Sequence, residues 1–590
     1  MAQTLVALTL ALPATAGVEW HVVDPMSETQ YLPDVVPDDG VKGGAVKIVA
    51  AKDEYEPGSF VIRADADLGK VSLEVGELKS EKGDVFPKDK LDLKTVKVWY
   101  QAGNAWFSYF ADKGSKLCPE LLLNDEDLIR VDEAKKANYA RLTETDGRVH
   151  EVWLNNPEAF QARVEGIRID GGVPGGAFCP MKENFKDAPK HCGVTLEKNR
   201  SKQFILTAKV EKGQPAGLYR GAIVIQAGTS RTGKTSKTDR GEKIASIPVV
   251  LRVLDFELPQ PMCWDDVNKP YLTFFCDYTN LGMIRKQNGN DAALAEKQLI
   301  AICRDFAAHG QTIPSFGGAH GRPDIVEAGG QHYDVHMASG SMLLSDPCIM
   351  RAAARVERRR ADRRFGKGSR AVLEYGDEYG LWLLKKIRPM VEIYEQMGFK
   401  LDVNSASGYS AGAATSDVFW PPVRPDAESA TYAAKFNAVT GGEGYFGWYA
   451  SQHVGVENPA FCRRQYGFGP YRAGLSCNFN YAHHIDGYND NVNELYRPMQ
   501  FVYGSGSGCI DTIQWEGFRE GLDDIRYATL LKRLALPHLT DVDTKSRYAA
   551  RLALQLLVDA DRDDFDLTTL RLEMIRRIER LRALDATSDK

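Results

Sequence analysis

The sequence predicts a multidomain protein with an N-terminal β-sandwich region, a (β/α)8 TIM-like barrel and a C-terminal helical segment. Three observations predict this order. Short runs of β-branched residues separated by turn residues occupy residues 17–261. Apolar runs then alternate with helical patterns over residues 262–520, as parallel strands joined by helices do. Amphipathic helical patterns occupy residues 521–590.

The first 16 residues have the pattern of a secretory signal peptide. An apolar stretch from Leu5 to Leu12 precedes Ala14-Thr15-Ala16, which matches the small-x-small pattern of a cleavage site. No Lys or Arg precedes the apolar stretch, so its start is atypical. We expect cleavage after Ala16 and a secreted or periplasmic protein; the alternative is a frayed strand.

The sandwich region is predicted from short runs with high β-propensity. Their spacing favours one or two β-sandwiches within residues 17–261. Leu258-Pro259-Gln260-Pro261 ends the region, because two prolines disfavour both a helix and a central strand. The predicted strands are 46–50, 59–63, 71–75, 96–100, 203–210, 221–226 and 247–253.

The barrel is predicted from eight candidate strands, the number that a (β/α)8 barrel requires. Helical patterns lie between several of them, notably at 292–309 and 381–397. After the barrel, residues 547–558 and 567–584 are both amphipathic. The candidate strands are 271–276, 312–316, 371–375, 400–404, 417–420, 444–449, 474–480 and 509–514.

Composition excludes several classes of function. Lys and Arg number 74 against 80 Asp and Glu, a net charge of −6, so no global field attracts nucleic acid. No apolar run reaches the roughly 18 residues of a membrane span. The ten cysteines are scattered without a C-x-x-C, so neither a zinc ribbon nor thioredoxin chemistry is supported. No metal or other cofactor is expected. Cys179 and Cys192 are the nearest candidates for a disulfide; buried thiols are the alternative.

Two nucleotide- or ion-binding patterns are better explained structurally. Residues 228–235 match G-x-x-x-x-G-K-[ST], but a polar turn and another strand follow Lys234, where phosphate binding needs a helix. A hairpin is therefore expected. Asp559-Ala560-Asp561 resembles the start of a calcium loop, but Asp564 and Leu570 stand where Gly and Glu are required.

A row of arginines follows one helix face. Arg351, Arg355, Arg359 and Arg363 recur every four residues. Such a row is usually a solvated face, and a sulfated or phosphorylated ligand is the alternative.

The most informative segment carries two adjacent carboxylates. Asp377 and Glu378 follow a predicted strand that ends at Gly376. Neighbouring strand residues point to opposite faces, so both can enter one site only where the strand breaks. Such a position at the end of a barrel strand is where catalytic groups lie. Two close carboxylates also separate in pKa, which supplies one acid and one anion. The alternative is a solvated turn.

Four features, in this order along the chain, resemble the glycoside hydrolase family 123 β-N-acetylgalactosaminidases and their domain-of-unknown-function 4091 relatives. One is a pair of sandwich segments, 214–222 and 253–259. The others are the Asp377-Glu378 pair, Gly447-Trp448-Tyr449 and an R-x-G-x-x-D-x-x-Y pattern from Arg519 to Tyr527.

The resemblance implies a retaining, substrate-assisted glycosidase in which the sugar's acetamido oxygen attacks the anomeric carbon. It implies that Asp377 orients the acetamido N–H, while Glu378 protonates the leaving oxygen and then activates water. Tyr449 would hydrogen-bond the acetamide, and Trp448 or Trp420 would form an apolar wall. The further substrate-binding candidates are Asn404, Tyr481 and Arg464.

Two departures keep other functions open. Tyr379 stands where the family commonly has Pro. The stretch 469–481 lacks the Trp that the family usually has near its end, and Phe479 and Tyr481 stand nearby instead. The expected activity is removal of terminal β-linked N-acetylhexosamine, N-acetylgalactosamine first, from a glycan or glycoconjugate. The alternatives are a glycosidase of other sugar specificity and a non-catalytic glycan-binding or surface scaffold protein.

Overall fold

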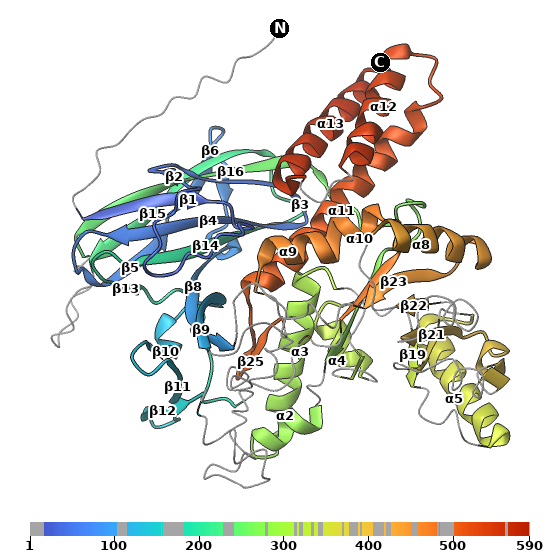
Figure 1. Ribbon diagram of the computed structural model, residues 1–590, viewed down its shortest axis with the longest axis horizontal. Coiled ribbons are helices and arrows are strands. Elements are labelled where there is room, and N and C mark those ends of the chain that lie inside the picture. The colour runs from blue at the N-terminus through green and yellow to red at the C-terminus, as the bar shows by residue number, and fades with distance from the viewer. Residues whose placement is uncertain are drawn as a thin grey trace. The chain divides into compact units, whose positions relative to one another are not determined.

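The computed structural model contains two compact units (Figure 1). The first, the sandwich unit, comprises residues 17–100, Leu117–Val131 and Asp187–Glu257. The second, the sheet unit, comprises the described residues within Gln101–Lys116, Asp132–Lys186 and Leu258–Lys590. The structure describes residues 17–102, 115–154, 156, 182–227, 241–277, 281–311, 316–317, 322–331, 336–339, 346–368, 371–376, 388–389, 392–404, 418–420, 426–449, 457–480, 483, 501–560 and 565–588.

In its described residues the sandwich unit has two sheets. The first has the order β2-β1-β4-β14-β8-β9 and the second β13-β5-β15-β16-β3, with β6 and β7 beside β15. The first sheet contains β1 (Val18–Val23), β2 (Val41–Lys42), β4 (Glu54–Ala64), β8 (Leu91–Ala102), β9 (Ser115–Leu123) and β14 (Ser201–Val210). The second contains β3 (Val46–Lys52), β5 (Gly69–Val75), β6 (Leu78–Ser80), β7 (Val85–Phe86), β13 (Val194–Leu196), β15 (Gly217–Ala227) and β16 (Lys243–Glu257). Two short 3-10 helices are η1 (Lys88–Lys90) and η2 (Glu126–Leu128).

Both sheets contribute to one apolar core. In β16, Ile247, Val249 and Leu251 are buried and alternate with more exposed residues, so one face of the strand lies inward. Phe60 of β4 stacks on Phe204 of β14 with ring centroids 5.2 Å apart. The core cluster includes residues of both sheets. The predicted β-structure of the N-terminal region is confirmed.

The pairing of β15 with β16 explains the rejected phosphate-loop pattern. The two strands pair antiparallel, with Ile223 opposite Ile247. Residues 228–240 between them lie outside the described residues. Strand, connection and strand therefore form the expected hairpin, and no helix begins between Gly241 and the start of β16.

A small hairpin lies in the sheet unit. β11 (Ala137–Thr143) pairs antiparallel with β12 (Val149–Trp153). β10 (Ile129–Asp132) spans the boundary between the two units.

The sheet unit is built on parallel strands whose described residues form the order β18-β17-β24-β23-β22-β21-β20-β19. Neighbours in this order are also neighbours along the chain, apart from the step from β17 to β24. The strands are β17 (Leu272–Asp277), β18 (Phe316–Gly317), β19 (His336–Ser339), β20 (Ala371–Gly376), β21 (Lys400–Asn404), β22 (Val418–Trp420), β23 (Tyr445–Tyr449) and β24 (Cys477–Asn480). No pairing between β18 and β19 occurs among the described residues, so a closed barrel is not seen there.

Seven of the eight predicted barrel strands overlap strands of this sheet, and the eighth prediction was wrong. Gly508–Ile510 (β26) pairs antiparallel with Tyr503–Ser505 (β25), outside the parallel sheet. The predicted strand also runs into a helix, because the Thr512 hydroxyl caps it by accepting the Trp515 N–H at 3.2 Å. β19 was not predicted, because its His-Met-Ala-Ser sequence contains no β-branched residue.

Helices alternate with the strands and follow them. The predicted helix at 292–309 is confirmed as α3, whereas much of the predicted helix at 381–397 lies outside the described residues. Among the described helices, none is both long and apolar enough to cross a bilayer. The helices are α2 (Leu281–Gln287), α3 (Ala292–Ala308), α4 (Pro323–Ala328), α5 (Pro347–Phe365), α8 (Ala427–Val439), α9 (Pro459–Arg463), the π-helix η3 (Arg464–Phe468), α10 (Gly469–Arg472), α11 (Ile513–His538), α12 (Thr544–Asp559) and α13 (Leu567–Ser588).

Candidate active site

The carboxylate pair follows the end of β20. The parallel register with β21 shifts between Glu374 and Gly376, so the ladder is irregular just before the pair. This agrees with a strand that breaks at Gly376. Asp377 and Glu378 themselves lie outside the described residues.

Other predicted residues occupy neighbouring strand ends. Asn404 ends β21 and is the register partner of Trp420, which ends β22. Tyr449 ends β23 and is the register partner of Phe479 in β24. Tyr481, directly after β24, lies outside the described residues. Because parallel strands end at one edge of a sheet, these backbone positions lie along the same edge as the end of β20.

Trp448 lies inside the packing of the sheet unit. Its side chain is 2% exposed, and its ring centroid is 5.6 Å from that of Tyr466 in η3. The neighbouring Asn478 amide donates to the Tyr466 carbonyl at 2.7 Å. Trp448 therefore contacts the helical layer beside β23.

Arg464 contacts the C-terminal segment. Its Nη2 donates to the carbonyl of Phe565 at 2.6 Å, just before α13 begins. This described contact ties η3 to the chain before α13.

Asp524 and Tyr527 of the R-x-G-x-x-D-x-x-Y pattern in α11 belong to a buried ion cluster. The carboxylate of Asp524 accepts two bonds from Arg463, at 2.7 and 2.9 Å, and one from Arg571 Nε at 2.7 Å. Arg571 also bonds the Glu520 carboxylate and lies over the Tyr527 ring, 5.5 Å from its centroid. The pattern thus joins α9, α11 and α13.

The charges of this cluster stabilise one another. Burial alone would raise the pKa of Asp524, but the guanidinium groups of Arg463 and Arg571 outweigh it and hold that pKa below its usual value. A buried carboxylate with two such partners remains ionised.

Two glycines allow α11 to approach α9 and η3 closely. A Cβ at Gly521 would lie 2.6 Å from the Arg463 carbonyl oxygen and 3.0 Å from the Gly467 Cα. A Cβ at Gly517 would overlap the backbone of Pro459. Glycine in the pattern is therefore required by helix packing.

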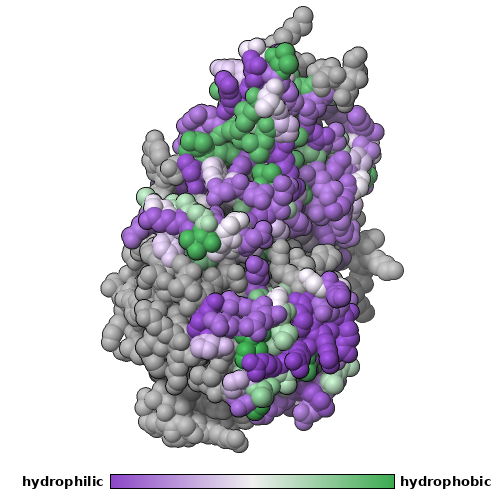
Figure 2. All heavy atoms as spheres, turned by 90° about the vertical axis from the view of Figure 1, so that its right-hand side faces the viewer, coloured by the Kyte–Doolittle hydropathy of each residue, from purple (hydrophilic) through white to green (hydrophobic). Residues whose placement is uncertain are grey.

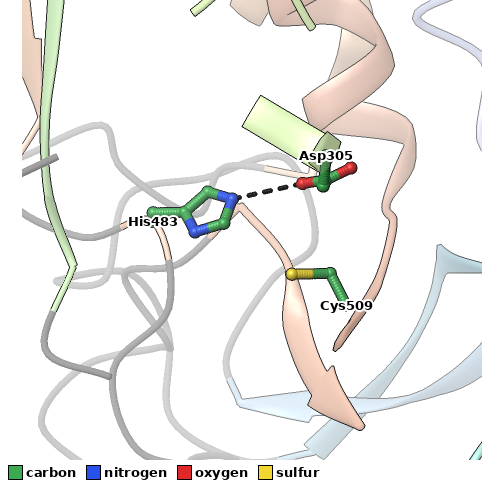
Figure 3. A group of neighbouring side chains, drawn as sticks. All are labelled: Asp305, His483 and Cys509. Carbon is green, nitrogen blue, oxygen red and sulfur yellow. Dashed lines mark hydrogen bonds and ion pairs between the residues drawn. The ribbon is translucent and has the colours of Figure 1, made fainter. Parts of the chain in front are cut away.

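A second polar cluster, not predicted from the sequence, is centred on Asp305 of α3 (Figure 3). One carboxylate oxygen of Asp305 faces His309 Nδ1 at 3.2 Å. The other accepts Trp515 Nε1 at 3.0 Å and lies 3.4 Å from His483 Nε2. The side chains come from positions up to 210 residues apart, so no sequence motif reveals them.

Charge pairing in this cluster shifts two titrations in opposite directions. Burial alone would lower the pKa of His309, but Asp305 and Glu516 outweigh it and raise that pKa to about 9. His309 in turn holds the pKa of Asp305 well below its ordinary range, against the effect of burial. The pair is therefore charged at neutral pH.

The arginine row on α5 is exposed, as expected for a solvated face. Arg351, Arg355, Arg359 and Arg363 are all exposed. Figure 2 shows the side of the molecule on which α5 lies, where hydrophilic residues predominate around this helix. Arg358 and Arg360 pair within the helix with Asp362 and Glu357.

Comparison with known proteins shows a similarity of fold. No family model matches the sequence, and no curated protein does. A putative β-galactosidase from Bacteroides fragilis, 8% identical, matches 81% of this chain and 60% of its own, but its TM-score of 0.27 establishes no shared fold. A family 123 glycoside hydrolase from Clostridium perfringens, studied for its hydrolysis of glycolipid glycans, is 10% identical. It matches 97% of this chain and 100% of its own with a TM-score of 0.59. The chain therefore shares the fold of that family 123 glycoside hydrolase.

Proposed function

We propose that the protein is an exported glycoside hydrolase that removes terminal β-linked N-acetylhexosamine, N-acetylgalactosamine in particular. The observation that carries the proposal is the row of adjacent strand ends, from β20 to β24, at which the sequence places a carboxylate pair, an amide and aromatic residues. The fold shared with a family 123 glycoside hydrolase supports it. Catalysis is assigned to residues 262–520.

The proposal includes closure of the parallel sheet into a (β/α)8 barrel. The strand order begins at β18 and ends at β19, which are consecutive along the chain. One further pairing between these two strands would close the sheet. Closure would bring all eight carboxyl ends around one mouth, the position of active sites in such barrels.

In the proposed reaction the substrate supplies the nucleophile. Asp377, as the anion, orients the acetamido N–H, and the acetamido oxygen attacks the anomeric carbon. Glu378 gives its proton to the leaving oxygen and then takes one from the attacking water. Tyr449 donates to the acetamide oxygen. Asn404 and Tyr481 are assigned to substrate hydroxyl groups.

Of the two tryptophans, Trp420 is the better candidate for the apolar wall. Trp448 packs on Tyr466 and is nearly inaccessible, which accounts for it as a core residue. Trp420 ends β22 at the register position of Asn404. Arg464 remains a weaker candidate, because its described hydrogen bond goes to Phe565.

Turnover of chromogenic β-N-acetylgalactosaminide and β-N-acetylglucosaminide tests the proposal. We expect the Glu378→Gln variant to lose ~10²–10⁴-fold in kcat, the usual contribution of a general acid. Glu428→Gln, at an exposed carboxylate in the first turn of α8, is the matched control and should retain full activity. A fully active Glu378→Gln variant would remove the assigned role. Tight retention of a glycan without any turnover would instead favour a glycan-binding protein.

Participation of the acetamido group has its own test. A thiazoline analogue of the cyclised intermediate should inhibit, because it mimics the shape and charge of the transition state. Indifference to the thiazoline, together with turnover of a 2-hydroxy glycoside, would point to a glycosidase of other specificity.

Export is tested on the mature N-terminus. Residues 1–16 lie outside the described residues, and β1 begins at Val18. Sequencing of the exported protein should begin at Gly17. An intact Met1 on protein recovered from the cells would contradict the assignment.

A further inference from the structure

Three side chains with metal-binding atoms lie close together, and Asp305 is one of them (Figure 3). They are Asp305 of α3, His483 just after β24 and Cys509 of β26, and one ligand atom from each lies within 4.8 Å of the others. His483 is fully buried, and the other two are partly buried. Three separate segments of the sheet unit thus converge on one point.

The donor set fits zinc. Zn²⁺ binds thiolate, imidazole and carboxylate ligands, usually in a tetrahedron. Two nitrogen or oxygen ligands at about 2.0 Å from such an ion lie roughly 3.3 Å apart. His483 Nε2 and Asp305 Oδ2 are separated by 3.4 Å, so this pair already has the required spacing. The Cys509 sulfur lies within 4.8 Å of both atoms, and a tetrahedral edge to a sulfur ligand measures about 3.5 Å.

The surroundings hold two of the three ligands in orientation. Trp515 Nε1 donates to one oxygen of Asp305, and His309 Nδ1 forms an ion pair with the other at 3.2 Å, so both oxygens are held in place. The His483 ring lies 3.8 Å from that of Phe306, centroid to centroid. Such supporting contacts are typical of metal ligands, because they limit the movement of the donor atoms. Cys509 lies in a two-stranded hairpin, where a change of rotamer can supply the remaining movement.

We propose that Asp305, His483 and Cys509 bind one Zn²⁺ ion, with a water molecule or a fourth protein ligand completing the tetrahedron. The ion links His483 to α3 and to the β25–β26 hairpin. Its role is structural, and the site stands independently of the proposed glycosidase activity. Binding requires the Cys509 thiolate, so it releases a proton and weakens in acid.

The test uses the full-length protein, stripped of metal with a chelator and titrated with Zn²⁺ or Co²⁺. We expect one Zn²⁺ per chain by mass spectrometry of the metal content. Co²⁺ should give a thiolate-to-cobalt charge-transfer band. Cys509→Ser should abolish this band and weaken Zn²⁺ binding by more than ~10-fold. Loss of a residue that only supports a metal ligand can already weaken binding by that factor, so loss of the ligand itself should exceed it.

Cys348→Ser, at an exposed cysteine in the first turn of α5, is the matched control and should bind like the wild type. His483→Gln provides a second ligand variant, and circular dichroism of both ligand variants shows whether they fold. Absence of Zn²⁺ binding by the wild type would overturn the proposal. So would unchanged Zn²⁺ binding by Cys509→Ser, or a cobalt complex without the thiolate band.

Discussion

The sandwich unit and the C-terminal helices of the sheet unit bury different kinds of side chain. The core between the two sandwich sheets is apolar, with Ile247, Val249 and Leu251 as typical members. The helix α11 instead buries Glu516, Arg519, Glu520, Asp523 and Asp524 along with its apolar residues. Apolar contacts are non-directional, whereas buried charges depend on particular partners. The first region should therefore respond to substitutions gradually, and the second abruptly.

The largest difference is expected from Asp524→Asn. It leaves Arg463 and Arg571 buried without their shared anion, which should destabilise the sheet unit by about 3–5 kcal/mol. Glu19→Gln, in an exposed pair with Lys42 of the sandwich unit, should cost at most about 1 kcal/mol. Hydrogen exchange read separately over α11 and β1 measures both. Equal destabilisation by the two variants would contradict the contrast between the two regions.

A pH dependence of about 3 kcal/mol is expected from His309. Its pKa is about 9 in the folded protein against about 6.5 in the unfolded chain, so protonation favours the fold. This stabilisation is complete below pH ~6.5 and is lost as the pH rises through about 9. Urea unfolding followed at α11 from pH 6 to 10 should show the decline, and His309→Gln should flatten it. His150→Gln, at an exposed ring, should leave the curve unchanged.

A smaller effect is expected where α11 packs on η3. Gly521→Ala places a methyl group against the Arg463 carbonyl and should destabilise by about 1–3 kcal/mol. Gly213→Ala in the sandwich unit meets no atom within 4 Å and should be nearly neutral. Thermal unfolding of the two variants compares them directly. An unaffected Gly521→Ala protein would mean that the helices separate at little cost.

The smallest effect is expected in the apolar core. Ile247→Val removes one buried methylene and should destabilise the sandwich unit by about 0.5–1.5 kcal/mol. Hydrogen exchange over β15 and β16 reports this change. A loss as large as that of Asp524→Asn would show that the sandwich core is equally intolerant.

The same contrast explains what could be predicted from the sequence. Alternating β-branched runs give β16 and its neighbours, because burial on one face of a strand leaves a period of two. The parallel strands that were predicted carry β-branched residues or Phe, Tyr and Trp, as at Lys400–Asn404 and Tyr445–Tyr449. β19, which was missed, carries neither kind. Strand order and the β25–β26 hairpin depend on contacts that a local pattern does not encode.

The candidate site divides in the same way. Gly376 and the ladder irregularity beside it follow from a local pattern, and so do the strand ends at Asn404 and Tyr449. The R-x-G-x-x-D-x-x-Y spacing pointed to Asp524 but not to its partners. Arg571 lies 47 residues further along the chain, and the cluster of Asp305 joins still more distant positions. Long-range polar contacts of this kind become visible only in the folded chain.

The pairing of β4 with β14 determines when the sandwich can form during synthesis. Ser59 donates its hydroxyl to the carbonyl of Phe204, 145 residues later in the chain. At about 5–20 residues per second, a ribosome needs roughly 7–30 s to synthesise that interval. Throughout this time β4 has one unpaired edge and an uncovered apolar face, both of which favour aggregation. The risk of aggregation for the nascent chain therefore lasts until β14 emerges.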